Sequence, residues 1–254
     1  MRRAIVWFAL VAPVILLLLW PHKPLAGIGV LAISHALLLY PTLRPNVQWL
    51  GPVITHFTPS TADAREVWLT IDDGPTEDTH AVLDLLDARN VKATFFLIGM
   101  LADAHPELVR AIAERGHTIG NHSQSHPSGT FWCLPPAAVA TEVDACSRAL
   151  ESATRMRPRW FRAPVGMKNP GVHPILEKRG MRLIGWSIRS FDGVETTPER
   201  VLARILPRVT SGSILVLHQG RAGTLAIVAR VIDELHTRGY SFVIPADDRL
   251  KTKR

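Results

Sequence analysis

The stretch Val67-Trp68-Leu69-Thr70-Ile71-Asp72-Asp73-Gly74-Pro75 sets the fold class of this chain of 254 residues. Its first five residues form an apolar and β-branched run, which predicts a buried strand. Two aspartates follow directly, and Gly74-Pro75 then favours a turn. Neighbouring side chains at a strand end point in different directions, so we expect Asp72 and Asp73 to have separate roles.

Three later segments repeat this arrangement of a strand-like run followed by polar residues. They are His122-Ser123-Gln124-Ser125-His126 after Thr118-Ile119, Arg162-Ala163-Pro164 after Trp160-Phe161, and His218 after the run 214–217. Each segment alone has an ordinary explanation, as a turn, a chance pair of histidines or a buried strand. Side chains beyond the carboxyl ends of successive parallel strands, however, converge on one face of an α/β barrel. The order of the four segments therefore predicts a single site.

Helix-like and strand-like runs alternate along the rest of the chain. The spacing of apolar residues predicts helices over 79–89, 107–115, 135–152, 172–179, 198–209 and 225–238. Strands are predicted over 67–72, 93–98, 182–186, 213–217 and 240–244. This alternation predicts parallel strands joined by helical crossovers.

The four segments, in this order, resemble the motifs of polysaccharide deacetylases with a NodB-homology domain, carbohydrate esterase family four. The resemblance covers roughly residues 66–245. It implies an α/β fold, a distorted (β/α) barrel with about seven parallel strands. It also implies a hydrolase that removes N-acetyl groups from amino sugars in a polysaccharide or glycolipid, with the help of a divalent metal.

By this resemblance, Asp73, His122 and His126 match the metal ligands of the family. Two imidazoles and one carboxylate leave coordination positions open for water and substrate. Zinc is the expected metal, and cobalt, nickel or ferrous iron suits the same ligands. Ser123 is expected to hydrogen-bond near the histidines as support.

Three further residues match the catalytic groups of the family. Asp72 matches the general base and His218 the general acid that protonates the leaving nitrogen. Arg162 is expected to orient Asp72 and to favour its charged form, and the alternative for Arg162 is a surface ion pair.

The substrate side of the site is expected to include two leucines and a backbone amide. By the resemblance, Leu215 and Leu217 line a pocket for the acetyl methyl group, and a plain core role is the alternative for both. Val165 stands where the family often has an aromatic residue. Its backbone NH is a candidate donor to the oxyanion.

The fourth motif of the family, over residues 186–193, is only partly present. It keeps Trp186, a candidate substrate contact, and Asp192, a candidate partner for His218. Arg189 stands where many members have an acid, and Gly193 where many have tryptophan. The partner of His218 therefore stays open at this point.

Two apolar runs, 4–20 and 25–40, predict membrane-anchoring helices over residues 1–41. Each run spans about 25 Å as a helix, enough for a thin bilayer. A cleaved signal peptide is the alternative, because Arg2 and Arg3 precede the first run. These arginines favour a cytoplasmic start. Two full spans would then return the catalytic domain to the cytoplasm, whereas one span plus an interfacial segment would place it outside.

The remaining composition limits partners and chemistry. Residues 42–65, rich in proline and threonine, are predicted to be a linker, and residues 66–254 the catalytic domain. The lysines and arginines exceed the acidic residues and give a net charge of +7, but they are scattered and form no nucleic-acid motif. This pattern favours attraction to anionic lipid headgroups or an acidic glycan over nucleic acid, and favours a solvated basic C-terminal tail over both. The expected partners are therefore an N-acetylated glycan or glycolipid, by the resemblance, and a membrane, by the apolar runs, with no nucleic acid. Cys133 and Cys146 are expected to be free buried thiols, or paired if the domain is extracytoplasmic. His105, His117 and His173 lack a motif and are expected at the surface or in loops.

Two rival functions remain at this point. One is a deacylase or deformylase of a lipid-linked sugar. The other is a noncatalytic glycan-binding protein on the same fold, which the loss of part of the fourth motif and Val165 would suit.

Overall fold

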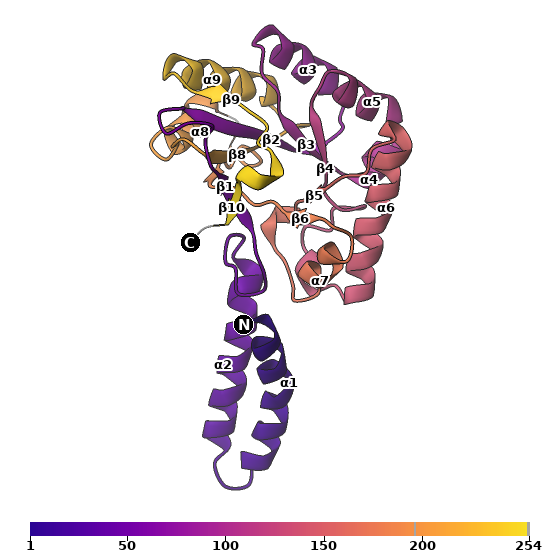
Figure 1. Cartoon of the computed structure of the whole chain (residues 1–254). Helices are drawn as coiled ribbons and strands as arrows, with labels where there is room; N and C mark the ends of the chain where they lie inside the picture. The colour runs from indigo at the N-terminus through magenta and orange to yellow at the C-terminus, as the bar shows by residue number, and fades with distance from the viewer. Residues whose placement is uncertain (196, 253–254) are drawn as a thin grey trace.

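The computed structural model describes residues 1–195 and 197–252. Figure 1 shows a helical hairpin that stands off an α/β domain. The hairpin consists of α1 (Arg2–Leu19) and α2 (Pro24–Leu43). Both helices are long and apolar enough to cross a membrane by length and composition, a criterion that a signal sequence also meets. Most of each helix is exposed, which distinguishes them from the core helices of the domain.

The domain alternates strands and helices, as predicted. Its strands are β1 (Ile54–Phe57), β2 (Glu66–Gly74), β3 (Thr94–Leu97), β4 (Thr118–Asn121), β5 (Trp160–Phe161), β6 (Arg182–Leu183), β7 (Ile188–Arg189), β8 (Ser213–His218), β9 (Ser241–Phe242) and β10 (Leu250–Thr252). Its helices are α3 (Thr79–Ala88), α4 (Gly99–Ala104), α5 (Pro106–Glu114), α6 (Pro136–Thr154), α7 (Val172–Glu177), α8 (Pro198–Ile205) and α9 (Thr224–Thr237), with 3-10 turns at Phe131–Cys133, Pro164–Gly166 and Asp247–Arg249. The short helix α4 was not among the predicted helices.

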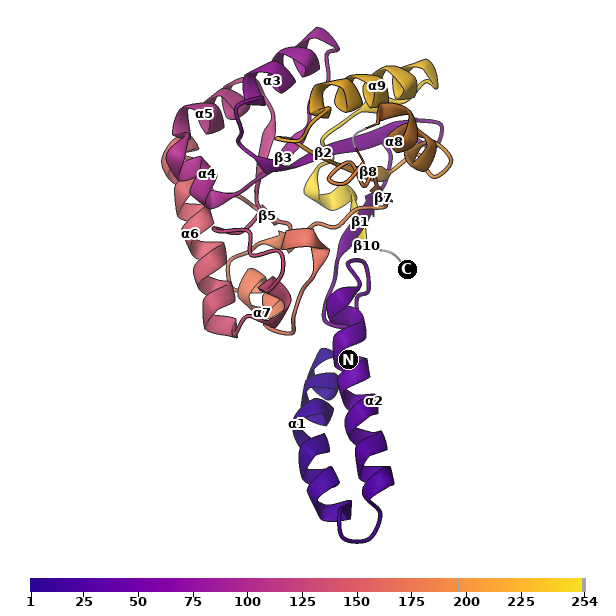
Figure 2. The same cartoon turned by 180° about the vertical axis from the view of Figure 1, so that it is seen from behind.

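The sheet runs in the order β10-β1-β8-β2-β3-β4-β5-β6, with β7 paired to β8 and β9 to β2. Pairing is parallel from β8 to β6. A bridge between Ile54 and Ile184 joins the far end of this order back to β1, so the sheet curls into a distorted barrel. Figure 2 shows helices around the outside of this sheet.

One strand corrects the prediction of a linker over residues 42–65. β1 lies inside the segment predicted as a linker, yet it pairs with β8 and β10. Both pairings are antiparallel, so the barrel is not built from parallel strands alone. The segment was predicted as a linker because it is rich in proline and threonine and its strand, Ile54–Phe57, has only four residues. So short a strand is stabilised mainly by its pairing partners, which the sequence pattern does not reveal.

Alternation along β2 separates the two sides of the barrel wall. Val67, Leu69 and Ile71 point outward, into a core shared with the surrounding helices. The side chains between them point into the barrel, where Trp68 donates a 2.9 Å hydrogen bond to Thr94 Oγ1. Because the period of a strand is two, Asp72 then also lies on the barrel side.

Strand β8 follows the same alternation and corrects a prediction. It is in register with β2, so Val216 lies beside Thr70 and His218 beside Asp72. Leu215 and Leu217 are completely buried in the outer core, against the helices. The expectation that they line a pocket for the acetyl group is therefore wrong, and their alternative role in the core is the correct one.

The histidines and cysteines outside the motifs differ from each other in burial. His117 and His173 are buried, contrary to prediction, and burial lowers the pKa of each to about 4. His117 accepts a hydrogen bond from the backbone NH of Ala93, which explains its place in the core. Both cysteines are free, as predicted, but Cys133 is exposed, contrary to the prediction, and Cys146 alone of the two is buried.

Candidate active site

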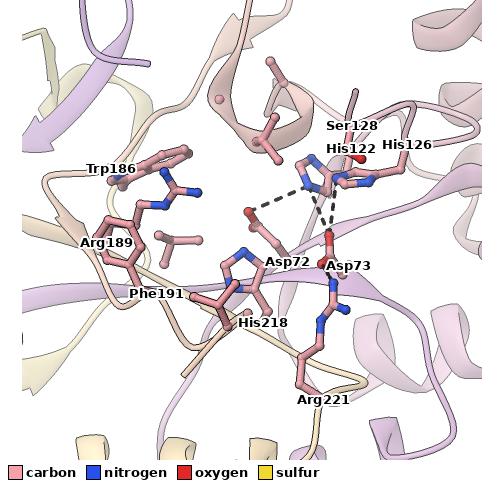
Figure 3. A pocket seen from close by; sticks show the side chains of 16 residues that line it. Asp72, Asp73, His122, His126, Ser128, Trp186, Arg189, Phe191, His218 and Arg221 are labelled. Atoms are coloured by element: carbon pink, nitrogen blue, oxygen red, sulfur yellow. Dashed lines mark hydrogen bonds and ion pairs between the residues drawn. The ribbon is translucent and has the colours of Figure 1, made fainter. Parts of the chain in front are cut away.

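Asp73, His122 and His126 converge where β2 and β4 end (Figure 3). The Nε2 atoms of both histidines lie 3.5 Å from Asp73 Oδ1. One ligand atom from each residue falls within 4.8 Å of the other two. The sequence-predicted metal ligands are therefore brought together by the fold.

The hydrogen bonding and charge of these three residues suit a bound cation. His122 Nδ1 lies 2.8 Å from the carbonyl oxygen of Arg162, to which it donates, so its Nε2 lone pair is free. Burial, together with the charge of His122, lowers the pKa of His126 to about 4, which favours the neutral imidazole that a metal needs. Asp73 Oδ1 is buried without a hydrogen-bond partner among the described residues. An orphaned carboxylate oxygen that faces the Nε2 atoms of two imidazoles fits a divalent cation.

The backbone is strained at this cluster. Asp73, Ser123 and His126 have φ values of 72°, 68° and 48°, in the left-handed region that non-glycine residues rarely adopt. Ser123 Oγ accepts a 3.2 Å hydrogen bond from the backbone NH of His126, and its own NH donates to Asn121 Oδ1 at 2.8 Å. Ser123 thus supports the histidine loop, the type of role the sequence predicts. Strain held in place by such contacts is typical of functional sites.

Asp72 is held by a buried arginine rather than a surface ion pair. Arg162 is completely buried, and its Nη1 donates to Asp72 Oδ1 at 2.7 Å and to Thr70 Oγ1 at 2.7 Å. Nη2 donates to the carbonyl of Gly185 at 2.8 Å, and the guanidinium lies 4.1 Å from the centre of the Phe96 ring. Loss of one partner from such a buried pair costs about 3–5 kcal/mol. The pair therefore fixes Asp72 firmly beside Asp73, His122 and His126.

His218 has a defined partner, the candidate that the sequence offered. Its Nδ1 lies 2.7 Å from Asp192 Oδ1, and its backbone NH donates to Asp192 Oδ2 at 2.7 Å. Ser190 Oγ also donates to Asp192. Burial lowers the pKa of His218, but the hydrogen bond and charge of Asp192 outweigh it, so the pKa lies above its usual value. His218 keeps its proton to higher pH than a free imidazole.

These groups border a cavity of about 290 Å³. Among the predicted substrate contacts, Val165 and Trp186 line it, as does Val216 in place of its neighbouring leucines. Sequence reasoning missed the contribution of Arg189, Phe191, Val194 and Arg221 to the lining. Arg221 Nη2 donates to Asp73 Oδ2 at 2.9 Å.

The signal for these missed residues was weak. Arg189 and Phe191 lie in the eroded fourth motif, where Arg189 replaces an acid. Their place beside the cavity follows from the pairing of β7 with β8, which sets Arg189 opposite Val216. No pattern in the sequence points to Arg221.

Comparison with known proteins agrees with this geometry. The polysaccharide deacetylase sequence profile matches residues 60–184. A chitooligosaccharide deacetylase of Bradyrhizobium sp. (strain ANU 289) is 37% identical over 158 residues, which cover 61% of this chain and 71% of that protein. The residues that the profile matches, 60–184, include Asp72, Asp73, His122 and His126.

Two solved structures share the fold. A family 4 carbohydrate esterase from Streptomyces lividans, in complex with acetate, is 28% identical with a TM-score of 0.67, over 73% of this chain and 95% of that one. A family 4 pseudoenzyme from Bacillus anthracis is 27% identical with a TM-score of 0.66, over 72% of this chain and 64% of that one. From the sequence, the site and these relatives, the chain belongs to the polysaccharide deacetylase family.

Proposed function

We propose that this protein is a metal-dependent hydrolase that removes N-acetyl groups from amino sugars in a polysaccharide or glycolipid. The observation that carries the proposal is the convergence of Asp72, Asp73, His122, His126 and His218 around one cavity. The chitooligosaccharide deacetylase among its relatives supports the same reaction class.

Hydrolysis of an amide at neutral pH needs an activated water, a stabiliser for the oxyanion and a proton for the leaving amine. A divalent cation bound by Asp73, His122 and His126 would supply an acidified water and polarise the acetyl carbonyl. Zinc is our proposal for this cation, and cobalt, nickel or ferrous iron fits the same ligands.

Asp72, the proposed base, and His218, the proposed acid, face the proposed metal ligands Asp73, His122 and His126 from the barrel side. Asp72 uses one oxygen to bind Arg162, while its other oxygen lies 3.8 Å from His122 Nε2, close to where a water would be activated. His218 uses Nδ1 to bind Asp192, which leaves Nε2 as the proton donor to the amine. Each group is held by one partner and keeps one atom for the reaction.

The cavity also offers surfaces for the sugar. The side chain of Trp186 lines the wall away from the histidines, where an aromatic ring suits the apolar face of a sugar (Figure 3). Val216 is placed next to His218 on the barrel side and would contact the acetyl methyl group. The backbone NH of Val165 is our candidate for the oxyanion.

Acetate release tests the proposal. The purified full-length protein, reconstituted with zinc, is incubated with chitooligosaccharides, peptidoglycan fragments and lipid-linked amino sugars, and products are scored by mass. We expect release from at least one substrate, and loss of both release and bound zinc in His122→Ala. His105→Ala, at an exposed histidine, is the matched control. Release that survives His122→Ala at wild-type level would defeat the proposal.

A noncatalytic glycan-binding role is the second candidate, and a family 4 pseudoenzyme is among the relatives of this chain. Erosion of the fourth motif favours it, since Gly193 replaces the usual tryptophan. Against it, the structure supplies His218 with a buried acidic partner in Asp192. Glycan binding without bound metal and without product from any substrate would favour this role.

We also propose that the hairpin anchors the protein in a membrane. α1 and α2 pack closely, because a Cβ on Gly27 would lie only 2.9 Å from Leu16. Their two domain-side ends meet the same part of the molecule, where Arg2 and Arg3 border a groove with Lys178. If both helices span the bilayer, Arg2 and the catalytic domain lie on the same side.

Charge favours the cytoplasm for that side. Arg2, Arg3 and Arg44 lie at the domain end of the hairpin, whereas Lys23 lies at its turn. Cytoplasmic ends of spans carry the excess of lysine and arginine. Protease should therefore cut the domain in inverted vesicles and spare it in spheroplasts. Cleavage in spheroplasts would reverse this orientation.

A further inference from the structure

Arg189 places an unpaired positive charge in the wall of the catalytic cavity. Its guanidinium lies 4.7 Å from the centre of the Phe191 ring and 5.6 Å from that of Trp186. Figure 3 shows it between these two rings, across the cavity from the histidines. Within residues 1–195 and 197–252, no carboxylate forms an ion pair with it. The other charged groups of the cavity wall, by contrast, all face oppositely charged or ionisable neighbours.

An arginine held in this way suits an anionic part of the substrate. The two rings restrain the guanidinium, so little conformational freedom is lost when it binds. Its planar set of donors matches a phosphate or carboxylate with two parallel hydrogen bonds. A neutral chitin-like polymer has no such group to offer.

The same wall rests on the segment that leaves the membrane hairpin. Asn46 Nδ2 donates a 2.8 Å hydrogen bond to the carbonyl of Trp186. Gly166 also lines the cavity and lies directly against both Trp186 and Pro45, since a Cβ there would lie 2.5 Å from Trp186 and 2.7 Å from Pro45. The cavity and the end of α2 are therefore in direct contact through Pro45 and Asn46.

A buried lysine makes this connection stiff. Lys168 Nζ donates to the carbonyls of Pro41, Arg44 and Pro45 at 3.2, 2.9 and 2.8 Å, and its backbone NH donates to Thr42. The carbonyls of Pro41 and Thr42 belong to the last turn of α2, where carbonyls lack partners within the helix, and those of Arg44 and Pro45 directly follow the helix. The hairpin therefore holds the domain at a fixed position, unlike a flexible tether.

The dimensions place the cavity wall at the level of lipid headgroups. α2 has 20 residues, so it is about 30 Å long, which equals the hydrocarbon core of a bilayer. Asn46 follows its last residue, Leu43, by three positions and so lies within about 10 Å of the helix end. The headgroup layer is itself about 5–8 Å thick.

We propose that the substrate is an N-acetylated amino sugar carried on a lipid phosphate, whose phosphate binds Arg189 while its lipid chain remains in the bilayer beside the hairpin. This inference rests on the function and the membrane anchoring proposed above, and it selects the substrate class among those that remained open. The reaction is the same hydrolysis, in which water cleaves the amide and leaves acetate and a free amine.

The experiment uses the full-length protein with zinc in phosphatidylcholine vesicles. Four glycosides of N-acetylglucosamine are compared: a long-chain phosphodiester, the methyl phosphodiester, a neutral long-chain glycoside and the neutral methyl glycoside. A chitooligosaccharide is the fifth substrate. Arg189→Gln is compared with Arg208→Gln, which removes an exposed charge outside the cavity.

We expect the long-chain phosphodiester to give the highest kcat/KM. Arg189→Gln should lower kcat/KM for both phosphodiesters by about 10–100-fold, mainly through KM, and leave the neutral glycosides within about twofold. Arg208→Gln should change none of them. An equal loss on charged and neutral substrates would show that Arg189 is structural and overturn the inference.

Other outcomes distinguish failure of the lipid-phosphate substrate from failure of the proposed deacetylase function. Faster release from the chitooligosaccharide or the neutral glycosides than from the long-chain phosphodiester would overturn the inference and leave the deacetylase function standing. Acetate release from none of the five would overturn the proposed function, and the inference with it.

Discussion

The two walls of the catalytic cavity are built in different ways. One wall, which we call the strand wall, consists of Asp72, Asp73, His122 and His126, at or just beyond the ends of β2 and β4. The other, the loop wall, is the segment 186–194, whose only strand within the described residues is the two-residue β7. The strand wall carries the proposed base and metal ligands, which hydrolysis of any acetylated sugar would need. The loop wall carries Arg189 and Phe191, which would contact only particular substrates. The difference suggests that chemistry is fixed by the sheet and substrate choice by the loop.

The strongest test of the strand wall is Asp72→Asn. The amide keeps the size of the side chain and a hydrogen-bond acceptor for Arg162, but it cannot take a proton from water. We expect acetate release to fall about a thousandfold, the range of a positioned general base, with zinc content unchanged. Acetate assays and metal analysis on the same sample check both statements. Turnover within tenfold of wild type would remove Asp72 from the role of base.

The strand wall was predictable from sequence because strand ends follow a local rule. A β-branched run followed by Asp-Asp or by His-x-x-x-His marks both the strand and its functional end. Asp192 could be named only as a candidate, since its contact with His218 spans 26 residues that include α8 and most of β8. Arg221 reaches Asp73 across 148 residues and has no pattern at all.

The leucines of β8 show a different limit. The resemblance correctly marks the Leu-x-Leu-His segment, but it does not say which face of the strand each side chain occupies. The register of β8 with β2 decides this, because Val216 pairs with Thr70 and His218 with Asp72 on the barrel side. A shift of one residue would exchange the two faces.

Leu217→Ala sharpens this distinction between core and cavity. The side chain is fully buried among helices, so its truncation should lower the free energy of unfolding by about 2–5 kcal/mol. Acetate release per folded molecule should stay within about twofold. Val216→Ala is the matched change on the cavity side and should raise KM for the acetylated sugar. A raised KM in Leu217→Ala alone would restore the leucine to the acetyl pocket.

In the loop wall, Asp192→Asn should have a smaller effect than the change at Asp72. Asp192 raises the pKa of His218, so the imidazolium persists to higher pH in the wild type. Without that charge the proton is lost at lower pH, and activity should decline earlier as pH rises. We expect kcat to fall about 10–100-fold near neutral pH. If the decline of activity at alkaline pH stayed at the same pH in Asp192→Asn, Asp192 would not control the protonation of His218 in catalysis.

Arg221→Gln should have the smallest effect, although Arg221 directly contacts Asp73, a proposed metal ligand. Its side chain is 48% exposed, and ion pairs of such exposure are worth about 0–1 kcal/mol because water screens them. Removal of the positive charge also frees Asp73 Oδ2 and reduces repulsion of a cation. We therefore expect zinc affinity, measured by competition with a chelator, to stay the same or rise up to about fivefold. A loss of zinc affinity greater than tenfold would mean that Arg221 holds Asp73 in its binding position, and the strand wall would then depend on a loop residue.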